Sequence, residues 1–400
     1  MDDWAPVSVR DLIMHIASGP SPTCEERPAQ SGEWGLLKTT AITWEKGWNS
    51  GAHKVPPVDY WRNQSTEVRA GDVLVTKAGP RHRVGVVAHV DETPPRLMVS
   101  GKMVLLRPDR SRVIPKFLAE SLATTPVQKF LDQRTTGMAE SQVNFANSTL
   151  LDCPLRIPTL EIQRRIVEIL DTLDEKVRHT EQMISKFEAA REGAVLAQLE
   201  EVANPSDSPI HPLGDLVAAP VCYGIVQPGR HVSDGVPMVA IRDLAGDFTR
   251  LHRVAEDLDK QYIRSRVRED DVLLSVKATI GRTAVVPKGF DGNISRDVAR
   301  LRPGRGVTAE YLELYLRSRP GQDLLRHAVV GTTRAEVSIG VLARLDLPLP
   351  PIDAQRRLAG LDQLFGERIA TETATLASTR QLREGVAGDL LSGTVRAAAA

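Results

Sequence analysis

The chain contains an internal duplication, and this feature constrains its fold more than any other. A Leu-x-x-Pro run, followed by Gln-Arg-Arg and an aliphatic residue, lies at 155–166 and again at 347–358. The copies are 192 residues apart, and the same offset separates Arg-Glu-Gly at 191–193 from Arg-Glu-Gly at 383–385. An offset kept over this distance indicates two equivalent elements without insertions. We therefore expect a chain that is built twice from one unit.

A looser match lies upstream of each of these runs. Gly71–Lys77 resembles Asp270–Lys277, and both are followed by Gly and Arg residues and a Val-containing strand pattern. The offset here is 199 residues, so the loops of the two copies differ in length. Between the copies, Asn204–Pro209 has the composition of a linker. The predicted order is a domain at 1–157, a helix at 158–203, a domain at 204–350, a helix at 351–393 and a tail at 394–400.

Two long helices are predicted after the repeated prolines. The segment 159–199 has no proline, and its apolar residues recur mostly every three or four positions. Pro158 and Pro351 stand where the fixed φ of proline suits a helix start. About 40 residues at ~1.5 Å each give helices of ~60 Å, which cannot bury a whole face against a small domain.

We expect the two helices to pair with each other as an antiparallel coiled coil. Thr180, Arg368 and Glu372 interrupt the apolar pattern, which favours a partly packed pair that also receives a partner protein. Two unrelated surface helices are the alternative. The residues expected in pairing and partner docking are Ile166, Ile169, Leu173, Val177, Phe187, Leu358, Leu361, Phe365, Ile369 and Leu376.

The segments between the helices carry short strand-like runs separated by Gly and Pro, which is typical of small α+β domains. The predicted fold class is therefore α+β, with two small domains separated by the two long helices and related by a pseudo-two-fold repeat.

The turn after one strand in each half is a candidate contact with nucleic acid. Asp72–Val75 and Asp271–Leu274 are predicted strands, each followed by a hydroxyl residue, a lysine and a turn with Gly and Arg. These groups suit phosphate and base-edge contacts, and a solvated surface turn is the alternative. A second loop ends each half, and its threonines could equally cap a helix or close a turn. The candidate DNA-binding residues are Thr76, Lys77, Arg81, Arg83, Arg134, Thr135, Thr136, Ser275, Lys277, Thr279, Arg282, Thr332, Thr333 and Arg334.

Charge is distributed unevenly, although 51 Lys and Arg residues balance 51 Asp and Glu residues. Lys260–Arg305 holds eleven basic residues against five acidic ones, whereas Leu160–Glu201 holds ten acidic residues against six basic ones. A basic domain beside an acidic helix is typical of a nucleic-acid reader with a protein-facing scaffold. Ordinary solvated surface charge is the alternative.

The sequence contains no recognisable catalytic, metal-binding or membrane motif. Cys24, Cys153 and Cys222 lie far apart without a Cys-x-x-Cys pattern, so neither a zinc site nor a disulfide framework is predicted. No Pro-Pro pair belongs to the Asn/Asp-Pro-Pro-aromatic motif of methyltransferases, and no Walker A or Gly-x-Ser-x-Gly sequence is present. No apolar run approaches the ~20 residues of a membrane span. We expect a cytoplasmic protein without catalytic residues, metal or cofactor of its own.

This arrangement resembles the specificity (S) subunit of type I restriction-modification systems. The resemblance covers nearly the whole chain. It is carried by the Pro-x-x-x-x-Gln-Arg-Arg helix starts at 158–165 and 350–357, the long helices after them, the paired Asp-Val-Leu runs and the Thr-Thr-Gly and Gly-Thr-Thr loops. Lys277–Arg282 matches the family's post-strand turn well, whereas Lys77–Arg83 departs from it in spacing.

The resemblance implies that each domain is a target-recognition domain, which reads one half of a split, asymmetric site in double-stranded DNA. It implies that the helices act as a ruler and dock two adenine-methyltransferase (M) subunits, with a restriction/translocase (R) subunit as an optional partner. S-adenosylmethionine is then expected on the methyltransferase and not on this chain. Two alternatives stay open at this point: a duplicated coiled-coil scaffold that binds protein or carbohydrate, and a stand-alone DNA-binding regulator.

Overall fold

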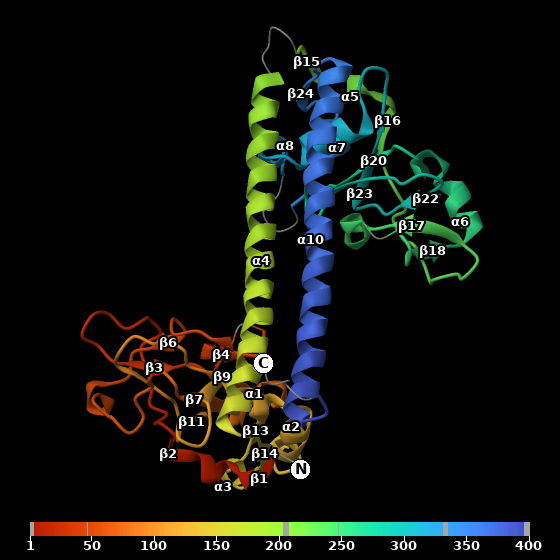
Figure 1. The fold of residues 1–400 in the computed structure, drawn as a ribbon. Coiled ribbons are helices and arrows are strands. Elements are labelled where there is room, and N and C mark those ends of the chain that lie inside the picture. Colours follow the sequence, from red (N-terminus) through yellow and green to blue (C-terminus); the bar gives the residue numbers. More distant parts are fainter. Residues whose placement is uncertain (1–3, 46, 203–207, 247, 331–334, 396–400) are drawn as a thin grey trace. The chain divides into compact units, whose positions relative to one another are not determined.

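The computed structural model describes residues 4–45, 47–202, 208–246, 248–330 and 335–395. The chain divides into two compact units (Figure 1). Unit 1 comprises residues 1–179 and 376–400, and unit 2 comprises residues 180–375. Each unit contains one domain together with a part of both long helices. Among the described residues, no helix combines the length and the apolar stretch that a bilayer crossing requires.

Unit 1 is organised around a four-stranded antiparallel sheet in the order β2-β11-β7-β9. These strands are β2 (Ile13–Ala17), β11 (Met103–Pro108), β7 (Val73–Thr76) and β9 (Val87–His89). Helix α1 (Pro115–Ala123) packs on β7 and β9, and α2 (Thr125–Asp132) follows it. The remaining elements are β1 (Ala5–Ser8) with β14 (Pro154–Ile157), β3 (Gly35–Leu37) between β10 (Leu97–Met98) and β6 (His53–Lys54), β4 (Ile42–Thr43) with β5 (Gly47–Trp48), β13 (Gln142–Asn144) between β12 (Thr136–Ala139) and β8 (Ala78–Gly79), and α3 (Asn147–Leu151).

Unit 2 repeats this plan. Its four-stranded antiparallel sheet has the order β16-β23-β20-β21, from β16 (Val217–Tyr223), β23 (Val298–Pro303), β20 (Val272–Ser275) and β21 (Thr283–Val285). Helix α7 (Ala309–Arg317) packs on β20 and β21, and α8 (Arg319–His327) follows it. The remaining elements are β15 (Ile210–Pro212) with β24 (Asp346–Pro348), the sheet of β18 (His252–Val254), β17 (Val236–Val239), β22 (Asp291–Ile294) and β19 (Val267–Arg268), and helices α5 (Leu213–Leu216), α6 (Glu256–Gln261) and α9 (Ile339–Leu342).

Both faces of each central strand are buried, which explains the uninterrupted apolar runs after Asp72 and Asp271. In unit 1, Val73 and Val75 lie in the same buried cluster as Phe117 of α1, whereas Leu74 belongs to a second cluster on the other face. In unit 2 the same division separates Val272 and Leu274 from Leu273. A strand covered on both faces reads as a continuous apolar run rather than as an alternation.

The aspartate before each central strand is a buried structural residue. Asp72 forms a bidentate ion pair with Arg107 of β11, with both N–O distances at 2.8 Å, and accepts a hydrogen bond from the N–H of Arg69. Asp271 forms the same pair with Arg302 of β23 at 2.7 Å. The repeated Asp-Val-Leu motif is thus part of the scaffold of both units.

Helices α4 (Leu160–Val202) and α10 (Ile352–Ser392) are continuous and contain 43 and 41 residues. In unit 1, Asp174 of α4 pairs with Arg383 of α10 at 2.9 Å, and in unit 2, Arg191 of α4 pairs with Asp362 of α10 at 2.6 Å. Earlier residues of α4 thus meet later residues of α10, so the two helices run antiparallel and side by side (Figure 1). The predicted α+β class and the antiparallel pair of long helices are confirmed.

The glutamine of each Gln-Arg-Arg run joins a long helix to its domain. Gln163 accepts a hydrogen bond from the N–H of Ile114 at 2.9 Å, and Gln355 accepts one from the N–H of Thr308 at 2.9 Å. Each glutamine also donates to the carbonyl of the proline five residues before it, at 2.9 and 2.8 Å. Both side chains are fully buried. Because Ile114 and Thr308 directly precede α1 and α7, the glutamine fixes the start of the long helix against the start of the domain helix.

The residues predicted to pair the helices form two groups. Ile166, Leu358 and Leu376 are buried; Ile166 lies in the core cluster of unit 1 and Leu358 in that of unit 2. The half-buried members are Ile169, Leu173, Val177, Phe187, Leu361, Phe365 and Ile369. The guanidinium of Arg368 lies 5.5 Å from the ring centre of Phe187. Arg368, which interrupts the predicted apolar pattern, thus packs on a residue that belongs to the pattern.

Candidate nucleic-acid interface

The hydroxyl that ends each central strand holds the following turn in place. Thr76 accepts a hydrogen bond from the N–H of Val86 at 2.9 Å and donates to the carbonyl of Arg83. Ser275 accepts one from the N–H of Arg282 at 2.8 Å and donates to the carbonyl of Thr279 at 2.6 Å. Both side chains are fully buried. The prediction that these hydroxyls face DNA is therefore corrected: they shape the turn from inside.

A glutamine that sequence analysis missed fixes each of these turns from the other side. Gln128 of α2 donates to the carbonyls of Gly85 at 3.0 Å and Leu122 at 2.7 Å. Gln322 of α8 donates to those of Gly281 at 2.9 Å and Leu316 at 2.7 Å. Gly85 and Gly281 have φ of +89° and +92°, and a Cβ on either would collide with its glutamine. Each glutamine is the fourth residue of its helix, and this shared position is the signal by which the sequence could have paired them.

The turn after β20, in the second half of the chain, exposes polar side chains to solvent. Thr279 and Arg282 are exposed, and among the described residues the Arg282 guanidinium has no hydrogen bond or ion pair. Lys277 is half-buried, pairs with Glu336 at 3.1 Å and lies 5.0 Å from the ring centre of Tyr223. Arg282 is therefore available to a phosphate or base edge, whereas Lys277 is partly neutralised.

The cations of the first-half turn are engaged within the domain. Burial lowers the pKa of Lys77, whose ammonium donates to Ser18 at 2.9 Å and Asn147 at 3.1 Å. Arg83 is half-buried and donates to the carbonyl of Thr39 at 2.9 Å. Lys77 and Arg83, both predicted to contact DNA, thus bind acceptors inside the domain instead.

Arg81 stays at the surface, between two carboxylates. Its guanidinium contacts Asp132 at 2.5 Å and Glu140 at 2.9 Å, and these hydrogen bonds raise the pKa of Arg81. A phosphate approaching Arg81 would compete with these two acids.

The second candidate loop lies beside the first turn in unit 1. Strand β13 lies between β12 and β8, so Asn144 is paired with Thr136 on one side and with Ala78, which follows Lys77, on the other. A cavity of about 400 Å³ is lined by Arg81 and Thr135, and also by Trp44, His82, Lys129 and Asp132. The structure thus gathers Arg81 and Thr135 at one cavity; sequence analysis had not singled out Trp44 or Lys129.

The loop residues themselves differ in availability. Arg134 is exposed and lies 3.8 Å from the ring centre of Phe130, while Thr136 is exposed at the start of β12. Thr135 donates to the carbonyl of Leu131 at 2.9 Å, as a residue closing a helix does. The corresponding second-half candidates, Thr332, Thr333 and Arg334, lie outside the described residues.

Much of the basic segment at 260–305 is structural. Arg300 is buried and donates to the carbonyls of Arg264 at 2.7 Å and Pro220 at 3.1 Å, and Arg266 pairs with Asp291 at 2.7 Å. Five of its cations are exposed and have no ion pair with the described residues: Arg264, Arg268, Arg282, Lys288 and Arg305. These five are the candidate phosphate contacts of unit 2.

Comparison with known proteins identifies the family. Residues 1–189 and 230–378 match the family model described as the Type I restriction modification DNA specificity domain. The chain is 27% identical to the EcoBI specificity subunit of Escherichia coli over 288 residues, which cover 64% of this chain and 61% of that protein. It is 29% identical to the EcoEI specificity subunit of Escherichia coli over 190 residues, covering 47% and 31%. The aligned parts therefore span less than two thirds of these two relatives.

More distant relatives match over a larger share of the chain. A putative type I restriction enzyme MjaX specificity subunit of Methanocaldococcus jannaschii is 20% identical over 346 residues, covering 82% of this chain and 79% of that protein. A solved chain from a type I R-M system, studied for its assembly and conformational transition, superimposes with a TM-score of 0.63 at 19% identity over 98% of both chains. The S subunit of a type I system from M. genitalium gives 0.56 at 14% identity over 97% and 96%. The fold is thus shared, and the family match covers most of the sequence. The chain belongs to the family of type I restriction-modification DNA specificity domains.

Proposed function

We propose that this protein is the DNA-specificity subunit of a type I restriction-modification complex. Each domain reads one half of a bipartite, asymmetric site in double-stranded DNA, and the long helices dock two adenine-methyltransferase subunits. The chain contributes recognition, while S-adenosylmethionine and the methyl transfer belong to the methyltransferase. A restriction/translocase subunit is a further partner of the same complex in the cytoplasm.

One observation carries this proposal: the two units share their buried clamps but differ in what their turns expose. The Asp–Arg pair, the strand-end hydroxyl and the turn glutamine recur in both units. At the surface, unit 2 presents Arg282, which has no ion pair with any residue that the structure describes, whereas unit 1 presents Arg81 between two carboxylates. A common scaffold with unlike contact groups suits two half-sites of different sequence.

The proposal is tested by exchanging residues 1–157 for the equivalent domain of another specificity subunit. In a complex with the cognate methyltransferase, we expect one half of the methylated site to change and the other half to stay the same. Sequencing of methylated DNA reads both halves in one experiment. An exchange that leaves both halves unchanged, or alters both, would refute independent reading by the two domains.

A further inference from the structure

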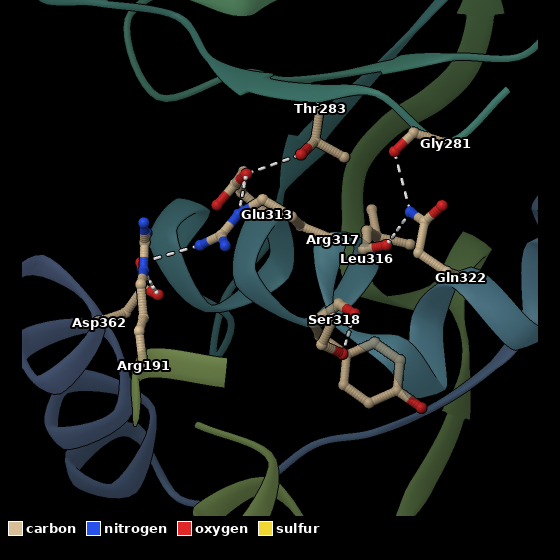
Figure 2. A network of polar contacts seen from close by, with 10 residues as sticks. Arg191, Gly281, Thr283, Glu313, Leu316, Arg317, Ser318, Gln322 and Asp362 are labelled. Atoms are coloured by element: carbon tan, nitrogen blue, oxygen red, sulfur yellow. Dashed lines mark hydrogen bonds and ion pairs between the residues drawn. The ribbon is translucent and has the colours of Figure 1, made fainter. Parts of the chain in front are cut away.

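A chain of polar contacts in unit 2 leads from the strand after the exposed turn to both long helices (Figure 2). Thr283 of β21 donates to the carboxylate of Glu313 in α7 at 2.6 Å, and Arg317 of α7 donates to the same oxygen at 3.0 Å. Arg317 also donates to Asp362 of α10 at 2.8 Å. Asp362 in turn receives two hydrogen bonds from Arg191 of α4, at 2.7 and 2.6 Å. Three separate elements of the unit are thus joined to β21 by side chains alone.

The turn that exposes Arg282 is linked to helix α7 on both sides. Gly281 precedes Arg282, and its carbonyl is held by Gln322, which also binds the carbonyl of Leu316 at the end of α7 (Figure 2). Thr283 follows Arg282 and is held by Glu313. The backbone on either side of Arg282 is therefore fixed to α7, so a shift of α7 would move the guanidinium with it.

The two carboxylates of this network are largely sheltered from solvent. The side chains of Asp362 and Glu313 are 15% and 17% exposed, and those of Arg191 and Arg317 are 30% and 39% exposed. Burial tends to raise the pKa of Asp362, but the Arg191 hydrogen bonds and the charges of both arginines outweigh it and hold that pKa below its usual range. Bidentate guanidinium–carboxylate pairs also fix orientation, because both partners are planar. The network contains two arginines and two acids, so its formal charges cancel.

Unit 1 shows that the fold does not require the polar contact between Thr283 and Glu313. The strand register places Val87 opposite Val75, as it places Thr283 opposite Leu274. Helices α1 and α7 are both nine residues long, and their fifth residues are Ala119 and Glu313. Val87 and Ala119 are buried in one apolar cluster, where unit 2 has a hydroxyl and a carboxylate. Helix α1 is itself joined to α4 and α10 by charges, through Lys116, Asp174, Glu120 and Arg383. Among the described residues, what distinguishes the second half is therefore the contact that extends such a network to the strand after the turn, Thr283 with Glu313.

We propose that Glu313, Arg317 and Asp362 are positioning residues for the second half-site: they set where the Arg282 turn lies relative to the helix pair. This inference rests on the proposed function. It implies that discrimination at the second half-site depends on a partly sheltered charge network that reaches the Arg282 turn through Thr283, a link that Val87 and Ala119 replace with apolar packing in the first half.

The test is made on the full chain assembled with its methyltransferase, by measuring affinity for the cognate site and for sites with one mismatch in either half. In the wild type, each mismatch is expected to cost about ten-fold in affinity. For Asp362→Asn we expect the cost of second-half mismatches to fall to about three-fold, while first-half mismatches keep their full cost. Asp353→Asn is the matched control, since Asp353 is an exposed acid on the same helix, and it should behave as wild type.

A second pair of variants separates positioning from general stability. Thr283→Val removes the hydroxyl but leaves the Arg191–Asp362 pair in place, and we expect the same selective loss in the second half. Thr283→Ser keeps the hydroxyl and should restore discrimination. Equal discrimination by wild type, Asp362→Asn and Thr283→Val, or an equal loss in both halves, would overturn the inference. A wild-type complex that prefers no split site would instead defeat the proposed function.

Discussion

At the scale of single residues, the polar side chains that recur in both halves form hydrogen bonds and ion pairs inside the protein. Gln163, Gln355, Asp72 and Asp271 are all buried and hydrogen-bonded to backbone or to arginine. A buried polar group is tolerated when its hydrogen bonds are complete, and it then fixes one geometry. The repeated motifs of this chain therefore mark the joints of the scaffold rather than its contact surface.

Gln355→Leu should destabilise unit 2, because it leaves the N–H of Thr308 and two carbonyls without partners. An unsatisfied buried group costs roughly 1–3 kcal/mol, so we expect a loss of about 3 kcal/mol in the free energy of unfolding. Urea denaturation followed by circular dichroism measures it. Gln363→Leu, an exposed site on the same helix, is the control and should change stability by less than ~0.5 kcal/mol. Equal stabilities for the two variants would contradict this account.

The Cys153 thiol should be inert in the folded protein. Burial raises the pKa of Cys153 to about 11 from the usual 9.0. The neutral thiol is thus favoured by folding: this contribution to stability is complete below pH 9 and is lost as the pH rises toward 11. We expect no alkylation of Cys153 at pH 8 by mass spectrometry of iodoacetamide-treated protein, and full alkylation in urea. Rapid labelling of Cys153 without unfolding would show that its burial is wrong.

The contact residues were predicted less well than the scaffold, and the reason is physical. A hydroxyl after a strand can point out to a ligand or back into its own turn. The hydroxyls of Thr76 and Ser275 point back and donate to carbonyls of the turn. Whether a cation is free depends on acids distant in sequence, as Asp132 and Glu140 are from Arg81. Arg282 was predicted and is exposed. Gln128 and Gln322 share a helix position that the sequence shows, but the carbonyls that they hold are known only from the structure.

At the scale of elements, the long helices were predictable because they combine an apolar stripe with an absence of proline. The imperfections of the stripe have an explanation in the structure. Leu358 and Val195 pack into the domain core of unit 2 rather than between the helices. Ion pairs connect the two helices in addition to the apolar contacts. The repeated Arg-Glu-Gly supplies these pairs, since Arg191 binds Asp362 and Arg383 binds Asp174. The repeat therefore marked the joint between the helices, although its partners could not be read from sequence.

Arg383→Met should weaken unit 1 strongly. Arg383 binds Asp174 at 2.9 Å and Glu120 at 2.5 Å. Its removal leaves Asp174 with Lys116 and leaves Glu120 without an ion pair among the described residues. Breaking a buried pair costs roughly 3–5 kcal/mol, and because these groups are partly exposed we expect about 2–3 kcal/mol. Thermal unfolding followed by circular dichroism tests this. Arg178→Met on an exposed face of α4 should have little effect. A melting temperature shared by both variants would exclude a role for this network in holding the helices.

At the scale of the whole molecule, duplication gives one scaffold two contact surfaces. The same four-stranded sheet, helix pair and glutamine clamps occur twice, so the fold class followed from the repeat and the strand pattern. The cations that the two turns expose are not repeated, since unit 1 exposes Arg81 between two carboxylates and unit 2 exposes Arg282. Under the proposed function, these two unlike surfaces read the two unlike parts of one site.

The most direct test is the methylome of cells that express this chain with its methyltransferase. The account predicts one methylated motif composed of two dissimilar short sequences separated by a fixed, unread spacer, and no such methylation when the chain is omitted. A continuous motif, two identical halves or methylation that does not require this chain would contradict it.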